Sequence, residues 1–273
     1  MTQPIKRVVV SLDAVSETDL AIDTAARLAA RWRVPLHGVF VEDEELISFA
    51  GLPFARQVTL ATGLEPLTKD HIEDHFRAFA ERSQRELAAA AARHGIEWSF
   101  EEVRGPLAAA ELGGEHDFVV ACAATRPVGE HFRIASPWWS LAAIMARPFL
   151  LAKRQWETGG SVFALLRCLG PQSTQVLEIA AQIADISEAT LTVAGPPDLA
   201  GTDDFAAWVS GLLEGHSVSL QTESAAAELA ALRQRIIELD CRLLVLEASL
   251  DEARPEELRE FVESLACNVL VVR

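Results

Sequence analysis

The sequence lacks any long apolar run. Apolar runs such as residues 118–124 and 269–272 fall far short of the roughly 20 residues that a membrane-spanning helix needs. It also lacks a positively charged and then apolar leader at its beginning. These two absences predict a cytoplasmic protein without a membrane segment.

Basic residues are scarce as well. The chain has 24 lysines and arginines against 40 acidic residues, and its net charge is −16. Such a charge repels the phosphate backbone of a nucleic acid at long range, so we expect no nucleic-acid partner. Half of the residues are hydrophobic and 23% are charged, which is typical of folded globular proteins rather than disordered ones.

Cysteine is rare, and no pair of cysteines has the C-x-x-C spacing of a metal site or a redox motif. The four cysteines lie in or beside apolar runs, at Cys122, Cys168, Cys241 and Cys267. This placement predicts buried, reduced thiols rather than a disulfide framework.

No catalytic motif is present. The sequence has no G-x-S-x-G elbow, no P-loop and no evident pair of catalytic carboxylates, so we predict no catalytic residues. His71 and His75 have the i,i+4 spacing used for zinc, but two histidines leave a zinc site incomplete. An exposed polar helix face is therefore the prediction there, and a metal-binding protein is the weaker alternative.

What the sequence does contain is a repeat. Residues 117–122 lead through a polar loop and a helix-like segment to 148–152, and residues 242–247 lead in the same way to 268–272. A repeat about 120 residues long indicates two sequential domains of one fold. We predict domains at 1–152 and 161–273, joined by a linker at 153–160.

Within each domain, short apolar runs alternate with helical patterns. Residues 7–12 are too few for a helix, residues 13–17 are cap formers, and residues 18–32 repeat apolar positions at helical spacing before a second strand at 36–41. Nearly continuous apolar strands separated by helices predict a parallel sheet that is covered on both faces. The remaining predicted strands are 97–103, 118–124, 149–152, 162–168, 190–194, 217–222, 243–248 and 269–272, and the remaining helices are 69–94, 105–112, 137–145, 173–186, 203–214, 225–239 and 255–265.

Residues 42–67 are longer and more apolar than an ordinary connection. Three interpretations stay open: a lid over a ligand cleft, a surface for a partner, or a segment that fills the core of its own domain.

With both halves laid out, the chain resembles a tandem universal stress protein over nearly its whole length. Residues 8–13, residues 36–43 and the paired endings carry the resemblance. It implies an α/β fold of two doubly wound parallel sheets, each of five strands in the order 3-2-1-4-5. It also implies that the edge strands at 149–152 and 269–272 meet, which would cover two apolar edges that otherwise invite aggregation.

Many members of this family bind ATP, and the resemblance transfers part of that site. Asp13 matches the aspartate at the end of the first strand, and Val41 matches the backbone group at the end of the second. The family's glycine loop, whose amides close around phosphates, is not kept. Its glycine positions hold Thr125, Val128 and Ala135, and side chains there disfavour the positive φ angles of a glycine cradle. Of this loop motif only Ser136 survives, while Arg126, with His131 and Arg133, offers positive charge to an anion.

In the second half, Arg167 replaces the aspartate, and the acidic loop 247–252 replaces the glycines, so we expect no ATP there. Trp138 and Trp139 are interpreted as core and interface residues rather than a stacking platform. The resulting prediction is a non-catalytic stress-response or regulatory module without a cofactor, which acts through contacts with an unknown protein partner and has lost or vestigial nucleotide binding. The alternative is an adenine-nucleotide sensor or slow ATPase with one ATP site in the first domain. A homodimer is left open.

Overall fold

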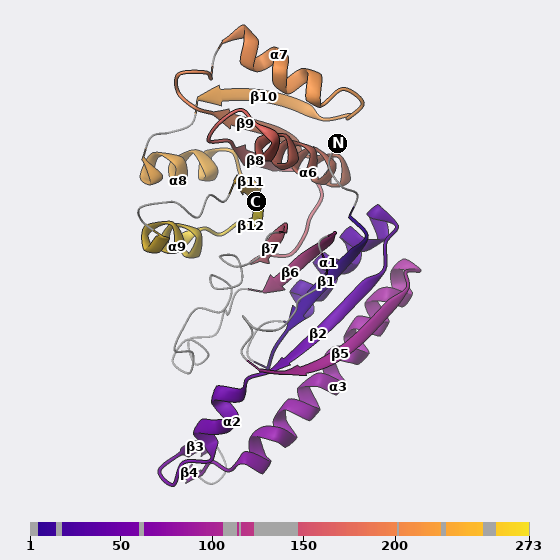
Figure 1. The fold of residues 1–273 in the computed structure, drawn as a ribbon, viewed down its shortest axis with the longest axis vertical. Helices are drawn as coiled ribbons and strands as arrows, with labels where there is room; N and C mark the ends of the chain where they lie inside the picture. Colours follow the sequence, from indigo (N-terminus) through magenta and orange to yellow (C-terminus); the bar gives the residue numbers. More distant parts are fainter. Residues whose placement is uncertain are drawn as a thin grey trace. The chain divides into compact units, whose positions relative to one another are not determined.

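The computed structural model describes residues 5–14, 18–59, 63–105, 114, 116–122, 147–200, 202–224, 228–247 and 255–272. They fall into two compact units, residues 5–144 and residues 145–273 (Figure 1). Among the described residues, no helix combines the length and the apolar character that crossing a membrane requires.

The first unit contains a parallel sheet with the strand order β6-β1-β2-β5. Strands β1, β2 and β6 are buried nearly throughout, whereas β5 is mostly exposed. The elements are β1 (Arg7–Leu12), α1 (Thr18–Trp32), β2 (Leu36–Glu42), α2 (Glu44–Ala50), β3 (Arg56–Thr59), β4 (Gly63–Pro66), α3 (Lys69–His94), β5 (Trp98–Arg104) and β6 (Asp117–Cys122).

The second unit contains five parallel strands in the order β10-β9-β8-β11-β12, and β7 is added beside β12 in the antiparallel direction. Numbered along the chain, β8 to β12 follow the order third, second, first, fourth, fifth. The elements are β7 (Phe149–Ala152), β8 (Ser161–Leu165), α6 (Pro171–Ser187), β9 (Thr190–Gly195), α7 (Asp203–Leu212), β10 (Ser219–Ser224), α8 (Leu229–Glu238), β11 (Cys241–Glu247), α9 (Pro255–Ser264) and β12 (Asn268–Val272).

The prediction of an α/β fold with a mainly parallel sheet is confirmed. Strand β7, which we expected to close the first domain, belongs to the second compact unit because its backbone pairs with β12. The domain limits 1–152, 153–160 and 161–273 stay a prediction. Strand β8 ends at Leu165, earlier than the predicted 168. The last two residues of the strand predicted at 118–124 lie outside the described residues, and so do nearly all of the helices expected at 105–112 and 137–145.

Local signals explain where the long helix α3 begins and ends. Thr68 Oγ1 accepts a hydrogen bond from the His71 amide at 3.3 Å, which caps the first turn. Gly95 ends the helix in the left-handed conformation with φ of 64°, a conformation that glycine adopts without steric cost. The helical face with Phe76, Ala80 and Leu87 is buried, and α3 contacts α1, α2 and the sheet.

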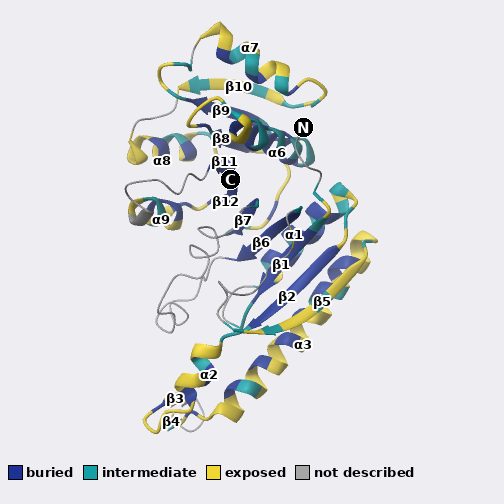
Figure 2. Ribbon diagram, in the orientation of Figure 1, coloured by how far each residue is buried: buried dark blue, intermediate teal, exposed yellow. Residues whose placement is uncertain are grey.

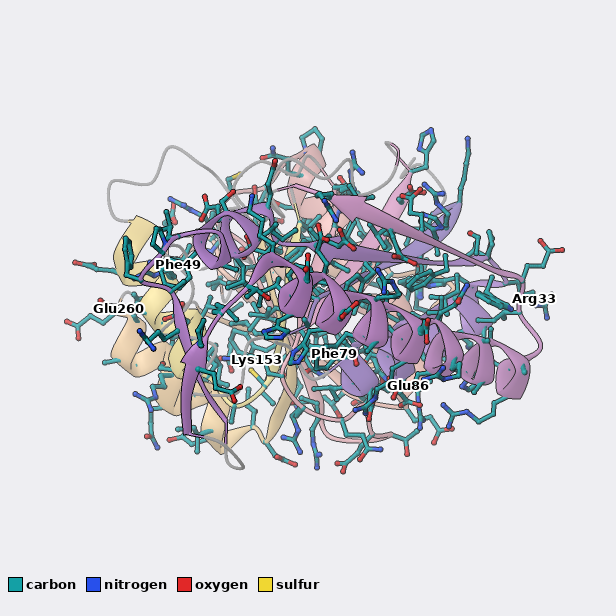
Figure 3. All side chains as sticks on the ribbon, turned by 90° about the horizontal axis from the view of Figure 1, so that it is seen from below. Arg33, Phe49, Phe79, Glu86, Lys153 and Glu260 are labelled. Atoms are coloured by element: carbon teal, nitrogen blue, oxygen red, sulfur yellow. The ribbon has the colours of Figure 1, made fainter. Side chains whose placement is uncertain are left out.

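The segment 42–67 is not an irregular connector, because it forms α2 and the β3–β4 hairpin. Asp43 Oδ1 caps α2 by accepting hydrogen bonds from the Glu45 and Leu46 amides at 2.9 and 3.2 Å. Helix α2 carries both buried and exposed residues (Figure 2). Ile47 is buried, whereas Phe49, labelled in Figure 3, is 39% exposed and Phe54 in the following turn is 70% exposed. The segment therefore contributes only part of its apolar side chains to the core.

Candidate functional site

The first candidate site lies at the carboxyl ends of β1, β2 and β6. Leu12 pairs with Phe40 on one side of β1, and Ser11 pairs with Ala121 on the other. The next residues along these strands, Asp13, Val41 and Cys122, therefore reach the same edge of the sheet. This edge is where open parallel sheets bind ligands, at the point where successive strands leave in opposite directions.

The structure thus places Asp13 and Val41 at the ends of neighbouring strands, and their part in a site stays a prediction. Val41 is buried with 4% exposure, and Asp13 is half-buried. The other three predicted site residues, Thr125, Arg126 and Ser136, lie outside the described residues, as do His131, Arg133 and the two tryptophans Trp138 and Trp139. Their part in the site stays a prediction.

An ion-pair cluster that the sequence did not indicate lies at the ends of β2 and β5. Arg104 Nε contacts Glu42 Oε2 at 2.8 Å, and its Nη1 contacts Glu73 Oε1 on α3 at 3.3 Å. The hydrogen bond from Arg104 to Glu42, together with the charge of Glu42, raises the pKa of Arg104. Two carboxylates already neutralise this guanidinium, so it adds no net positive charge for a phosphate. No sequence pattern indicated this cluster, because it depends on the β2–β5 register that pairs Glu42 with Arg104.

The corresponding edge of the second unit is closed by a buried carboxylate. Glu247, the last residue of β11, is 7% exposed, and its Oε2 accepts a hydrogen bond from the Arg167 amide at 3.4 Å. Ser173 Oγ lies 3.0 Å from the same oxygen and 2.5 Å from the Cys168 carbonyl, so its single proton has two acceptors. Cys168 Sγ donates to Glu247 Oε1 at 3.7 Å. The start of α6, a natural place for a phosphate, thus already faces a side-chain anion of the same chain.

An aromatic ring fills the neighbouring part of this edge. Gly195 ends β9, and a methyl group built in place of its hydrogen would lie 2.5 Å from Cζ of Phe205. Phe205 comes from α7 and is 1% exposed. Glu247 on β11 and Phe205 beside β9 therefore lie on either side of β8, at strand ends that correspond to those of Cys122 and Val41 in the first unit.

A Ser173→Ala substitution tests the closure by Glu247. We expect the free energy of unfolding of the second unit to fall by about 1–3 kcal/mol, because the buried carboxylate loses a hydrogen-bond donor. Ser187→Ala is the matched control: it is on the same helix, is also buried, and donates only to the neutral Ile183 carbonyl at 2.8 Å. Urea denaturation of both variants gives the comparison, and equal losses would contradict a special role for Ser173.

The histidine pair that has zinc-type spacing lies on helix α3. His71 and His75 both lie on the exposed side of α3, as expected of a polar helix face. Among the described residues, no group of three or more histidine, cysteine or acidic side chains is arranged to hold a metal ion.

One cysteine prediction is wrong. Cys122, Cys241 and Cys267 are buried and Cys168 is exposed, and none of the four forms a disulfide. Cys168 follows β8 in the loop before α6, where the apolar run has already ended, so its neighbours no longer cover it.

Parallel strands joined by helical crossovers, with candidate ligand positions at their carboxyl ends, define the chain as an α/β protein with a mainly parallel sheet. Its overall structure is similar to that of a universal stress protein from Archaeoglobus fulgidus DSM 4304, with 13% identity, a TM-score of 0.66, and coverage of 98% of this chain and 96% of that one. A structure from Pseudomonas aeruginosa UCBPP-PA14, of a protein assigned to the universal stress proteins, has 17% identity, a TM-score of 0.60, and coverage of 98% and 93%.

A functionally unknown protein from Pseudomonas aeruginosa PAO1 matches equally well, with 17% identity, a TM-score of 0.60, and coverage of 98% and 92%. No family model and no curated protein matches the sequence. The predicted resemblance to universal stress proteins is therefore confirmed for the fold, which extends over nearly the whole chain.

Proposed function

We propose that the chain is a cytoplasmic, non-catalytic regulatory module of the universal stress type, made of two five-stranded domains with the order 3-2-1-4-5. It acts through contacts with a protein partner, and its nucleotide binding is lost in the second domain and vestigial in the first. The observation that carries this proposal is the buried carboxylate of Glu247 at the start of α6.

In the proposed second domain, the charge of Glu247 excludes a phosphate. Two like unit charges about 4 Å apart repel by about 4 kcal/mol at the effective dielectric near a protein surface. Evicting the carboxylate instead would leave the Arg167 amide and the Ser173 hydroxyl to be satisfied anew. Repulsion by the carboxylate and displacement of the carboxylate would each weaken nucleotide binding by orders of magnitude.

Contacts with a protein are supported by the α2 region. Phe49, Leu52 and Phe54 are exposed there at 39%, 41% and 70%, and Phe79 on α3 is exposed at 37%. Figure 3 labels Phe49 and Phe79. Large exposed apolar side chains that gather on one segment are typical of interaction surfaces.

The adjacent placement of Asp13 and Val41 favours a second candidate, an adenine-nucleotide sensor with one site in the first domain. An aspartate beside a strand-end backbone group can hold a ribose, while the loop after β6 would have to hold the phosphates.

Isothermal titration of the full chain with ATP and Mg²⁺ separates the two. We expect no binding heat up to millimolar ATP in the unchanged protein. Micromolar binding at one site per chain would overturn the proposal in favour of the sensor. In that event Asp13→Ala should abolish the binding, and Arg167→Ala, the matched change in the second domain, should preserve it. Binding that survives Asp13→Ala would dispose of the candidate site in the first domain.

A further inference from the structure

Two cysteines lie side by side in the second unit, away from both sheet edges described above. Cys241 begins β11, and Cys267 immediately precedes β12. These strands are parallel neighbours in which Leu243 pairs with Asn268, so Cys267 lies one residue before this pair and Cys241 lies two residues before it on the adjacent strand. Their thiols share a hydrogen bond, and their residues are only 5% and 2% exposed.

The local backbone explains why the two thiols face each other. The register between β11 and β8 shifts between Cys241 and Leu243, and such an irregularity re-aims a side chain relative to strict alternation. Cys241 Sγ also lies 3.2 Å from the Leu243 carbonyl, to which it can donate. Neighbouring strands are about 4.8 Å apart, a separation compatible with the Cα distances of a disulfide.

A fixed ammonium group accompanies the pair. Lys153 Nζ, labelled in Figure 3, donates to the carbonyls of Val262, Glu263 and Leu265 at 2.7, 3.1 and 2.6 Å, at the end of α9. The backbone amide of Lys153 also donates to Asn268 Oδ1 at 2.8 Å, which joins the residue to the start of β12. The lysine is therefore held next to Cys267 by α9 and by the residue that follows this cysteine.

The surroundings give the two sulfurs different protonation behaviour. The hydrogen bond with Cys241 lowers the pKa of Cys267; burial opposes this effect, and the charge of Lys153 adds to it. The hydrogen bond with Cys267, together with burial, raises the pKa of Cys241 well above its ordinary value. Cys267 is thus the thiolate-forming member and Cys241 remains a thiol, which are the roles of an attacking and a resolving cysteine.

We propose that Cys241 and Cys267 form a redox-active dithiol that a small hydroperoxide oxidises to an intrachain disulfide. The thiolate of Cys267 attacks the terminal peroxide oxygen, the O–O bond breaks, and the alkoxide or hydroxide leaves with a proton from the site. The resulting sulfenic acid is then attacked by Cys241, the S–S bond forms, and one water leaves. Overall, the two thiols lose two electrons and two protons to form the disulfide. An organic hydroperoxide gives one alcohol and one water, and hydrogen peroxide gives two waters.

Burial selects the class of oxidant. Exposures of 5% and 2% exclude attack on a bulky disulfide or another protein, whereas a small uncharged peroxide reaches such groups through local opening of the structure. The exposed Cys168 is the internal contrast, because it is accessible to every reagent but has no cysteine beside it among the described residues.

Mass spectrometry with differential alkylation tests the proposal on the full chain. The reduced protein is treated with hydrogen peroxide, unfolded, alkylated and digested. We expect a crosslink between the peptides with Cys241 and Cys267, a mass loss of two hydrogens, and reversal by dithiothreitol, while Cys122 remains alkylatable. Four alkylatable thiols after treatment, or a crosslink through Cys122 or Cys168, would overturn the proposal.

Variants then test the assigned roles. Cys241→Ser should stop oxidation at a Cys267 sulfenic acid that dimedone traps, whereas Cys267→Ser should leave Cys241 unmodified. Lys153→Met should slow disulfide formation about tenfold, as expected when the thiolate fraction falls by one pKa unit. Lys69→Met, on the exposed start of α3, is the matched control and should not change the rate. Equal rates in both lysine variants would contradict the role of Lys153, and the unchanged protein gives the crosslink result even if a variant fails to fold.

Discussion

A Phe118→Ala substitution is expected to lower the free energy of unfolding of the first unit by about 3–5 kcal/mol. Phe118 lies on β6, is 0% exposed, and packs edge-to-face on Trp32 of α1 with ring centroids 4.9 Å apart. The truncation removes buried apolar surface, leaves a cavity and deletes an aromatic contact worth about 0.5–1.5 kcal/mol beyond its area. Urea denaturation followed by tryptophan fluorescence measures the loss.

The matched substitution in the second unit is Phe163→Ala on β8, where the side chain is 1% exposed. If the chain is two tandem domains, each substitution should shift the unfolding of one unit and leave the other in place. Hydrogen exchange with mass spectrometry assigns each transition to its peptides. Phe54→Ala, at a residue that is 70% exposed, should change neither transition by more than about 0.5 kcal/mol. A Phe118→Ala variant that weakens both units equally would contradict the tandem proposal.

Most of the regular elements could be predicted because each has a signal within its own residues. The run at 7–12 is too short for a helix and too apolar for a loop, and the spacing over 18–32 fits only a helix; the structure has β1 and α1 there. Strand ends were less predictable. Residues 166–168 were predicted to continue β8, but the strand ends at Leu165 and the chain brings Arg167 and Ser173 to Glu247.

Helix α2 and the β3–β4 hairpin were missed because seven-residue and four-residue elements are too short for a periodic pattern. Two usable signals were present. Asp43, followed by two glutamates, is an N-cap with an acidic first turn, and Gly63, the first residue of β4, has a φ of 79° that favours glycine. Capping residues and glycines such as these indicate where helices and strands begin, even where the elements are too short to show a periodic pattern.

The only part of the candidate site that could be predicted from the sequence is the part whose position follows from the order of the strands. Asp13 and Val41 end adjacent parallel strands, so a correct strand order is sufficient to bring them together. Glu247 and Ser173 are 74 positions apart, and their contact depends on how deeply each side chain is buried. The sequence indicated an acidic loop that repels phosphate, whereas the structure adds that its first carboxylate is buried and bonded at the start of α6.

The pairing of β7 with β12, which the resemblance implied and the structure confirms, gives the second large prediction. Leu150 and Leu270 are direct partners in this antiparallel pair, and both are 0% exposed. Each Leu→Ala change should cost about 2–5 kcal/mol in the second unit. Because the two side chains are neighbours, the double variant should differ from the sum of the single ones by about 0.5–3 kcal/mol. Urea denaturation of the four proteins completes the cycle.

A second cycle supplies the control. Leu191 on β9 is equally buried but is separated from β7 by three strands, so Leu150→Ala and Leu191→Ala should add within about 0.5 kcal/mol. Leu→Val changes give the same comparison at smaller cost if an alanine variant does not fold. Additivity in both cycles would mean that β7 is not held on β12 in solution, and the apolar edge of β12 would then need another cover to avoid aggregation. Non-additivity confined to Leu150 and Leu270 would show that the pairing of β7 with β12 stabilises the second unit.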